Sequence, residues 1–428
     1  MFKVLVIAYY YPPLGLSGVQ RTLKFTKYMS KFNWQPTVIT TGNVAYFAHD
    51  FYLLKEAENA GVNIIRTEAF DVNTIIGKQY QTVNMPKEFI RKILSRISKA
   101  IFIPDNKKSW ARKAYKTARE LLQKEKFDII FVTIPPFSSF VYAAKLKKEF
   151  GIPLFVDYRD LWFGNHFAFY PTLYHRYKHK KLEYKSLRLA DKVVAINRKI
   201  KEKLLLTYPF LSFNDVMIIP HGYDPADFEY SEDKVEQSQK MRLTYAGIFY
   251  ENITPEYFLK AFKQLSIERP DIAANIELEF IGHLRKEYKR LIIELGINEF
   301  VRDLGYLEHN ETVKRLKATD VLWMMIGNIQ NADTISTSKL FEYIGTGKPI
   351  LGSVVEGTAK CTLQEYGASF ITKPDDVQEI KDAIISIHEL YLKKNLPTPN
   401  RDFIQKHDRI KLTEELTKAF QFYLKAEA

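Results

Sequence analysis

Cysteine is almost absent from this sequence, because Cys361 is the only one among 428 residues. A single cysteine cannot form a disulfide within the chain, and it gives no support to a metal site built from several cysteines. A reducing compartment is the simpler interpretation. We therefore expect a cytoplasmic protein without a structural disulfide.

Long apolar runs are also lacking. The run Phe2–Ala8 is short and leads into Tyr9–Pro13 without the small-residue cleavage pattern of a signal peptide, so we interpret it as a buried first strand. The longest other apolar stretch, Ile129–Ala144, is interrupted by Pro135 and Pro136 and is too short to cross a bilayer. We expect a soluble or peripheral protein.

Acidic residues are outnumbered, since 50 Asp and Glu against 63 Lys and Arg give a net charge of +13. This balance favours a polyanionic partner, which could be a nucleic acid, a nucleotide or an anionic membrane surface. Charge alone does not choose among them. The positive residues are concentrated between Lys87 and Lys126.

Helical patterns alternate with short apolar runs along the whole chain. This order is typical of parallel strands joined by crossover helices, and the length suits two domains. We predict an α/β fold with a first domain over residues 1–225, a polar linker over 226–241 and a second domain over 242–410. A C-terminal helix over 411–428 is expected to pack back on the first domain.

The first candidate site is the turn Pro12–Arg21, which follows the first strand and precedes a helix. Gly15 and Gly18 would allow the backbone to approach a ligand closely. The spacing is not the GxGxxG of a dinucleotide-binding site. The alternative is a tight turn whose glycines are needed only for a positive φ.

The second candidate site is Asp157–Trp162, directly after the apolar run Pro153–Val156. Loops at the carboxyl ends of parallel strands are where such sheets bind ligands. Two carboxylates, Asp157 and Asp160, flank the guanidinium of Arg159 and could bind hydroxyls or organise a transition state. The alternative is a local ion pair that fixes the loop.

The third and most specific segment is Ser336–Ile350. Hydroxyl residues suited to a helix start precede Ser338, and glycines follow the helix. Lys339 and Glu342 are three residues apart and share one helical face. The helix start with Lys339 could neutralise a diphosphate, and Glu342 could accept hydrogen bonds from a ribose. The alternative is a salt bridge on a solvated face.

Taken together, these segments resemble the retaining GT-B glycosyltransferases of family 4, also called glycosyltransferase group 1, over nearly the whole chain. The corresponding motifs of that family are its N-terminal loop, its acceptor-side motif, its interdomain segment and its nucleotide-binding helix. They match Tyr9–Arg21, Asp157–Trp162, Ile219–Asp224 and Lys339–Tyr343 with Gly347–Pro349.

The resemblance implies two Rossmann-like domains that face each other across a cleft. It also implies transfer of a sugar from a UDP-sugar or GDP-sugar to an acceptor hydroxyl, with retention of anomeric configuration and without a metal or other cofactor. Such an enzyme would serve the assembly of a cell-surface polysaccharide or glycolipid, with a saccharide or lipid-linked acceptor. The residues implied for donor binding are Gly15, Gly18, Gly247, Ser338, Lys339 and Glu342.

Three departures from the family pattern concern the chemistry. Thr334 stands where the family has the first glutamate of its Glu-x7-Glu pair, and Tyr250–Ile253 stands where many relatives supply Arg and Lys to the diphosphate. Arg159 replaces the usual histidine of the acceptor motif and cannot act as a base. Asp157 or Asp160 is therefore the candidate for orienting or deprotonating the acceptor hydroxyl.

The segment 87–102 is predicted to form an amphipathic helix. Its apolar residues share one stripe and basic residues occupy much of the rest, so it could lie in an anionic membrane interface. The alternative is a core helix with a solvated basic back. The stripe consists of Ile90, Ile93, Leu94, Ile97 and Ile101.

Two other functions remain open at this stage. A nucleotide-sugar epimerase with the same architecture would rearrange a sugar without an acceptor. A nucleic-acid-binding protein would explain the charge, but it would be expected to interleave aromatic and basic residues on exposed strands, whereas the positive charge here follows helical spacing. We therefore expect no nucleic-acid partner.

Overall fold

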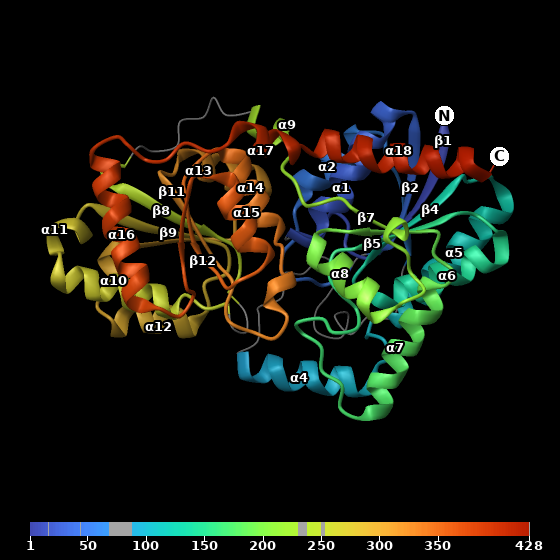
Figure 1. The fold of residues 1–428 in the computed structure, drawn as a ribbon, viewed down its shortest axis with the longest axis horizontal. Coiled ribbons are helices and arrows are strands. Elements are labelled where there is room, and N and C mark those ends of the chain that lie inside the picture. The colour runs from blue at the N-terminus through green and yellow to red at the C-terminus, as the bar shows by residue number, and fades with distance from the viewer. Residues whose placement is uncertain (16, 43, 68–87, 230–237, 250–252, 428) are drawn as a thin grey trace. The chain divides into compact units, whose positions relative to one another are not determined.

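The computed structural model describes residues 1–427 except 16, 43, 68–87, 230–237 and 250–252. The chain divides into two compact units. Unit 1 consists of Met1–Pro220 and Arg409–Ala428, and unit 2 consists of His221–Asp408. Each unit is built on one parallel sheet with helices on it, as Figure 1 shows.

Unit 1 contains a seven-stranded sheet in the order β3-β2-β1-β4-β5-β6-β7. Its central strands are continuous apolar runs, as expected for a parallel sheet covered on both faces, and all six residues of β4 are buried. The strands are β1 (Phe2–Ile7), β2 (Trp34–Thr41), β3 (Asn63–Thr67), β4 (Ile129–Ile134), β5 (Leu154–Tyr158), β6 (Lys192–Ala195) and β7 (Val216–Ile218).

The helices of unit 1 connect these strands, and the last helix of the chain joins them. They are α1 (Ser17–Met29), α2 (Phe51–Asn59), α4 (Glu88–Ile101), α5 (Lys108–Lys124), α6 (Phe137–Phe150), α7 (Leu173–Leu187), α8 (Arg198–Thr207) and α18 (Arg409–Glu427), with short 3-10 turns at Ser30–Phe32 and Phe213–Asp215.

Helix α18 packs beside α1 on unit 1. Leu412, Leu416 and Phe420 recur every four residues and are buried. The Phe420 ring lies 5.1 Å from the Trp34 ring and 4.8 Å from the Phe155 ring, centre to centre. The apolar stripe of α18 therefore completes the core on this face of the sheet.

Unit 2 contains a six-stranded parallel sheet in the order β10-β9-β8-β11-β12-β13. The strands are β8 (Met241–Ala246), β9 (Ile276–Ile281), β10 (Val301–Gly305), β11 (Val321–Met325), β12 (Ile350–Ser353) and β13 (Ser369–Thr372). The helices are α9 (Pro225–Glu229), α10 (Glu256–Glu268), α11 (Pro270–Ala273), α12 (Lys286–Glu294), α13 (His309–Ala318), α14 (Ser338–Thr346), α15 (Thr358–Tyr366), α16 (Val377–Leu392) and α17 (Arg401–Lys406), with 3-10 turns at Asn298–Phe300 and Ala332–Thr334.

The predicted linker over 226–241 begins inside α9 and ends where β8 starts, and its residues 230–237 lie outside the described part of the chain. The strand predicted at Pro153–Val156 runs further than expected, because β5 continues to Tyr158. Asp157 is therefore a residue of the strand rather than of the loop that follows it.

Candidate active site

Helix α14 carries three of the residues expected to bind a donor, Ser338, Lys339 and Glu342. Thr337 precedes the helix in an extended conformation, and the helix ends at Gly347, whose φ of 71° is left-handed. The first backbone N–H groups of the helix have no carbonyl partner within it, so this end carries partial positive charge. Lys339 adds a cation one residue after the helix begins.

Lys339 is held by an aromatic residue. Its Nζ donates a hydrogen bond to the hydroxyl of Tyr245 at 2.7 Å and lies 4.3 Å from the centre of the Tyr245 ring. Burial lowers the pKa of Lys339 to about 7, while the nearby Glu342 carboxylate acts in the opposite direction. Within the described residues Lys339 makes no ion pair at salt-bridge distance, so its charge is available to an anion.

Gly247 makes room for this ammonium group. A Cβ atom at Gly247 would lie 2.5 Å from Lys339 Nζ, and the φ of +142° at this position disfavours any residue with a side chain. Its own N–H donates to Ile281 O at 2.8 Å. Glycine is therefore needed at position 247 both for its backbone conformation and to leave space for the ammonium group of Lys339.

Glu342 has an unused acceptor. Its Oε1 is buried and has no hydrogen-bond partner in the described part of the chain, and the same holds for Thr337 Oγ1. Buried polar atoms without partners are uncommon, and one explanation is a ligand that supplies the missing hydrogen bond. The alternative interpretation of Lys339 and Glu342, a surface salt bridge, does not describe this arrangement, since Lys339 turns to Tyr245.

Both carboxylate oxygens of Asp157 in unit 1 accept hydrogen bonds from other side chains. The guanidinium of Arg21 donates to its carboxylate from Nη2 at 2.8 Å and from Nε at 3.0 Å, and both side chains are 1% exposed. The hydroxyl of Thr133 donates to the other oxygen at 3.1 Å. Asp157 thus forms a buried ion pair that holds α1 against β5.

Arg159 also forms hydrogen bonds, but its partners are backbone oxygens and not carboxylates. Its guanidinium donates to the backbone oxygens of Gly18, Ile134 and Pro135. The local ion pair considered for this motif is therefore absent from the described residues, and the Asp157 partner is Arg21. Arg159 instead ties the first turn of α1 to the end of β4.

Asp160 is the remaining carboxylate of the motif. It makes no hydrogen bond within the described residues, and burial raises its pKa to about 6 while Arg159 acts in the opposite direction. A carboxylate without a partner and with a raised pKa at the carboxyl end of a parallel strand has the properties of a general base. The structure thus separates Asp160 from Asp157 by their partners.

The two glycines of the first turn differ in role. The N–H of Gly15 donates to Ala48 O at 2.9 Å, so this backbone group already has a partner. Gly18 lies in the first turn of α1, and its φ is not left-handed. The requirement for a positive φ considered for Gly18 is therefore wrong, and its carbonyl accepts from Arg159 instead.

Helix α4 exposes its apolar stripe. Ile90, Ile93, Leu94, Ile97 and Ile101 are between 42% and 66% exposed. The alternative in which this stripe packs in the core is therefore wrong. None of the helices in the described residues is long and apolar enough to cross a membrane.

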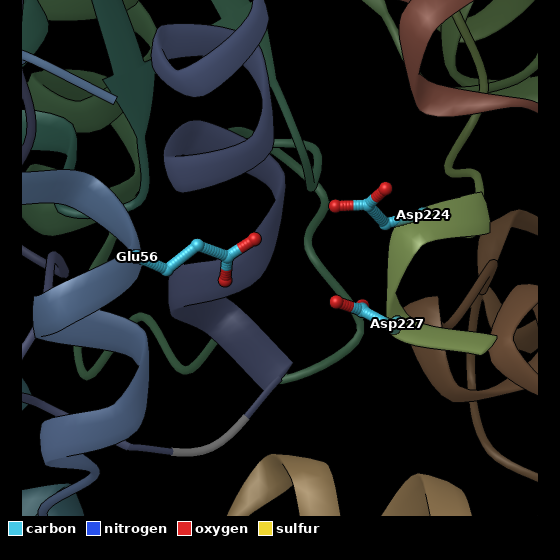
Figure 2. Close-up of side chains that lie close together, drawn as sticks. All are labelled: Glu56, Asp224 and Asp227. Atoms are coloured by element: carbon cyan, nitrogen blue, oxygen red, sulfur yellow. The ribbon is translucent and has the colours of Figure 1, made fainter. Parts of the chain in front are cut away.

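Three carboxylates shown in Figure 2 each have a partner in their own unit. Glu56 on α2 accepts from Lys24 Nζ at 2.6 Å in unit 1. Asp227 on α9 pairs with His309 Nε2 at 2.9 Å, and Asp224 accepts from the N–H of Ala226, both in unit 2. These contacts account for the three side chains as structural groups.

Comparison with known families decides the class of this chain. Residues 77–227 match the family described as Glycosyltransferase Family 4, and residues 227–401 match Glycosyl transferases group 1. The chain belongs to the group 1 glycosyltransferases. It is therefore an enzyme of the transferase class, and the predicted membership of glycosyltransferase group 1 is confirmed.

Solved structures of this fold cover the whole enzyme. A glycosyltransferase from Rickettsia africae shares 14% identity at a TM-score of 0.66 over 99% of both chains. The Anabaena protein HepE in complex with UDP shares 13% at 0.61, over 98% of this chain and 100% of that chain. A UDP-N-acetylglucosamine 2-epimerase shares 13% at 0.56, over 99% and 96%. These likenesses show the GT-B fold, as predicted.

No curated protein matches the sequence of this glycosyltransferase. Its departure at Thr334 has a structural consequence. Thr334 is 5% exposed, and its hydroxyl donates to Asn331 O at 2.8 Å within the short turn before α14. A threonine that closes this turn supplies no carboxylate, so Glu342 is the only acidic member of the pair that remains.

Proposed function

We propose that this enzyme transfers a sugar from a nucleoside-diphosphate sugar to an acceptor hydroxyl and that unit 2 holds the donor. The observation that carries the proposal is the pair formed by Lys339, a cation without an ion-pair partner, and Glu342, whose buried Oε1 lacks a hydrogen bond. The cation suits a diphosphate and the carboxylate suits the hydroxyls of a ribose.

In this proposal the leaving diphosphate takes the electron pair of the sugar C1–O bond. Lys339 and the N–H groups around Ser338 stabilise the charge that develops, and the glycine at 247 leaves room for the lysine. The first turn of α1, with Gly18, is proposed to offer further N–H groups to the donor. Gly15 would serve by shaping that turn, since its own N–H is used.

Asp160 is proposed to orient or deprotonate the acceptor hydroxyl. Its carboxylate has no hydrogen bond in the described residues, whereas Asp157 is neutralised by Arg21 and Arg159 is bound to backbone oxygens. The new bond joins the acceptor oxygen to the sugar C1. Retention of the anomeric configuration follows the family and needs no enzyme nucleophile.

A thermal-shift screen against UDP, GDP and their sugars tests the donor site, because a ligand that binds the native state raises apparent stability. We expect stabilisation by at least one nucleoside diphosphate, and HepE bound to UDP makes UDP the first to try. Glu342→Ala should abolish the shift. Glu256→Ala, which removes a partly exposed carboxylate from α10, is the matched control and should retain it.

The epimerase alternative is separated by the product. Incubation with the stabilising nucleotide sugar alone should yield no rearranged sugar if the enzyme is a transferase. Formation of a new sugar isomer without an acceptor would show that the enzyme is an epimerase and not a transferase. The absence of a shift with every nucleotide would count against both functions.

We also propose that the acceptor is a saccharide or a lipid-linked sugar in cell-surface polysaccharide or glycolipid assembly, reached at the cytoplasmic face of an anionic membrane. The exposed stripe of α4 supports this proposal, because Lys92 and Arg96 are exposed on the same helix. The start of α7 adds Leu173, Tyr174 and Tyr177, which are 82%, 59% and 57% exposed. Apolar, tyrosine and basic side chains together suit a membrane interface.

Helices α4 and α7 form one continuous surface for this contact. His175 Nε2 on α7 lies 3.0 Å from Ala100 O on α4, within hydrogen-bonding distance. The guanidinium of Arg96 lies 5.5 Å from the centre of the Phe169 ring in the segment that leads into α7. Membrane docking would therefore involve both helices rather than residues 87–102 alone.

A further inference from the structure

Glu183 is a buried carboxylate in the C-terminal half of α7, and the proposed mechanism does not use it. It is 0% exposed. Its oxygens accept hydrogen bonds from the hydroxyl of Tyr158 at 3.0 Å, from the hydroxyl of Tyr208 at 2.7 Å and from the N–H of Phe163 at 2.8 Å. It forms no ion pair within the described residues, so it acts as an acceptor of three neutral donors.

Two of these donors bracket the segment that carries Asp160. Tyr158 is the last residue of β5 and Phe163 follows Trp162, so Glu183 binds the chain at both ends of residues 159–162. The indole N–H of Trp162 donates to His179 Nδ1 at 3.1 Å. His179 is one helical turn before Glu183, on the same face of α7.

A buried carboxylate without a cation is costly to the fold. Burial raises the pKa of Glu183 to about 7, although its three hydrogen bonds act in the opposite direction. An apolar side chain at this position would avoid that cost but would leave a backbone N–H and two hydroxyls unpaired. The carboxylate is therefore explained by what it holds rather than by ion pairing.

We infer that Glu183 is a positioning residue that fixes the loop of Asp160 for reaction with the acceptor. This inference rests on the proposed role of Asp160. The described hydrogen bonds of Glu183 involve Tyr158, Phe163 and Tyr208, none of which is proposed to bind the donor or to act on the acceptor, so its loss should affect turnover and not donor affinity. The loop would lose its anchor at both ends at once.

The chain offers a matched pair of variants to test this. Tyr158→Phe and Tyr208→Phe each remove one buried hydroxyl bonded to Glu183, but only Tyr158 adjoins the Asp160 loop. Glu183→Ala removes all three hydrogen bonds. Glu183→Gln keeps the shape and can still accept from the N–H of Phe163, so it should restore function.

The measurements are release of nucleoside diphosphate from the stabilising nucleotide sugar with water as acceptor, donor affinity, and amide hydrogen exchange over residues 158–163. We expect Glu183→Ala and Tyr158→Phe to lower kcat at least tenfold with unchanged donor affinity and faster exchange in the loop. Tyr208→Phe and Glu183→Gln should stay within about threefold of the unaltered enzyme.

The outcomes separate the two proposals. If no nucleotide sugar binds the unaltered enzyme, the proposed function is contradicted. If the donor binds normally but Glu183→Ala leaves kcat and hydrogen exchange in the loop unaltered, only the positioning role of Glu183 is contradicted. If Tyr158→Phe and Tyr208→Phe lowered kcat equally, in step with their melting temperatures, Glu183 would contribute only to the stability of the fold. That result would overturn the inference.

Discussion

The ammonium group of Lys339 rests on Tyr245, 2.7 Å from its hydroxyl oxygen and 4.3 Å from its ring centre. The ring comes from the end of β8 and the lysine from the start of α14, so two elements far apart in sequence build one cation site. An aromatic face and a hydroxyl stabilise a cation less than a carboxylate would. The lysine therefore remains responsive to an anionic ligand.

This relationship predicts that donor affinity depends on pH. The pKa of Lys339 is lowered to about 7 in the free enzyme, and a bound diphosphate should raise it, so binding takes up a proton above pH 7. Affinity for the nucleotide sugar should fall up to about tenfold per pH unit above pH 7, since one pKa unit corresponds to a factor of ten. Titration calorimetry between pH 6 and about 9 measures this slope.

Lys339→Met should remove the pH dependence together with most of the affinity. The groups facing Lys339 are the Glu342 carboxylate and the Tyr245 hydroxyl, so the ammonium group is the one to which the slope is assigned. Lys260→Met, at an exposed position of α10, is the control and should leave both affinity and slope unaltered. A Lys339→Met variant that kept the slope would assign the proton to another group.

A second prediction concerns Gly247→Ala. The added Cβ would lie 2.5 Å from Lys339 Nζ in a backbone conformation with φ +142°. We expect at least a tenfold loss of donor affinity because the ammonium group must move. Gly296→Ala also places an alanine at a positive φ, +63°, but its nearest neighbour is a lysine tip at 3.8 Å. It should lower stability and leave donor affinity unchanged, and equal affinities in the two variants would contradict the prediction.

Much of the fold could be predicted from local patterns. The continuous apolar run Pro153–Val156 predicted β5, and hydroxyls before Ser338 with glycines behind predicted the helix α14. These signals are local, because strand burial and helix capping depend on neighbours in sequence. For the same reason the donor helix was the most specific segment of the sequence.

The partners of the candidate residues could not be predicted in this way. Arg21 and Asp157 are 136 residues apart, and only the order of the strands brings α1 to β5. Nothing in the strand sequence around Tyr245 marks it as a partner of Lys339, and Glu183 lies in a helix rich in lysine and tyrosine with no apolar periodicity to mark a buried position. The ion pair with Arg21, formed across 136 residues of sequence, is what distinguishes Asp157 from Asp160, and residue type alone could not predict it.

The third prediction separates the two aspartates of that motif. Asp160→Asn should lower nucleoside-diphosphate release by about 10²-fold or more with donor affinity intact, as for loss of a general base. The pKa of Asp160 is raised to about 6, and the reacting form is the carboxylate, so turnover should fall as the pH drops below 6. Asp157→Asn should instead lower the melting temperature, because it leaves Arg21 buried without its counter-charge. A stable Asp160→Asn enzyme with normal turnover would contradict the assignment.

The fourth prediction concerns the membrane surface. Leu94→Asp combined with Ile97→Asp should abolish sedimentation with vesicles that contain anionic lipid, because both side chains are at least 50% exposed and leave the fold intact. Binding by the unaltered enzyme should weaken with added salt. Ile293→Asp, at an exposed position of unit 2, is the matched control and should bind normally. Equal binding of all three proteins would show that α4 is not the docking element.

The fifth prediction concerns the stability of unit 1. The pKa of Glu183 is raised to about 7 in the folded state from an ordinary 4.5, so between these pH values the folded state holds a proton that the unfolded state has lost. Stability from this group therefore falls as the pH rises from 4.5 to 7 and then levels off. The groups facing Glu183 are Tyr158, Tyr208, Tyr170 and His179; the tyrosines stay protonated in this range, and the pKa of His179 is lowered to about 4.

Glu183→Gln removes this titration and should make the unfolding free energy of the variant rise relative to the unaltered enzyme by up to about 3 kcal/mol between pH 4.5 and 7. Urea unfolding followed by tryptophan fluorescence in a Trp323→Phe background reports on unit 1, because Trp34, Trp110 and Trp162 all lie there. Subtracting the two pH curves cancels the other titrating groups. Parallel curves between pH 4.5 and 7 would mean that Glu183 is ionised in the folded enzyme as it is in the unfolded chain, and the loop of Asp160 would then be held by a charged carboxylate in this range.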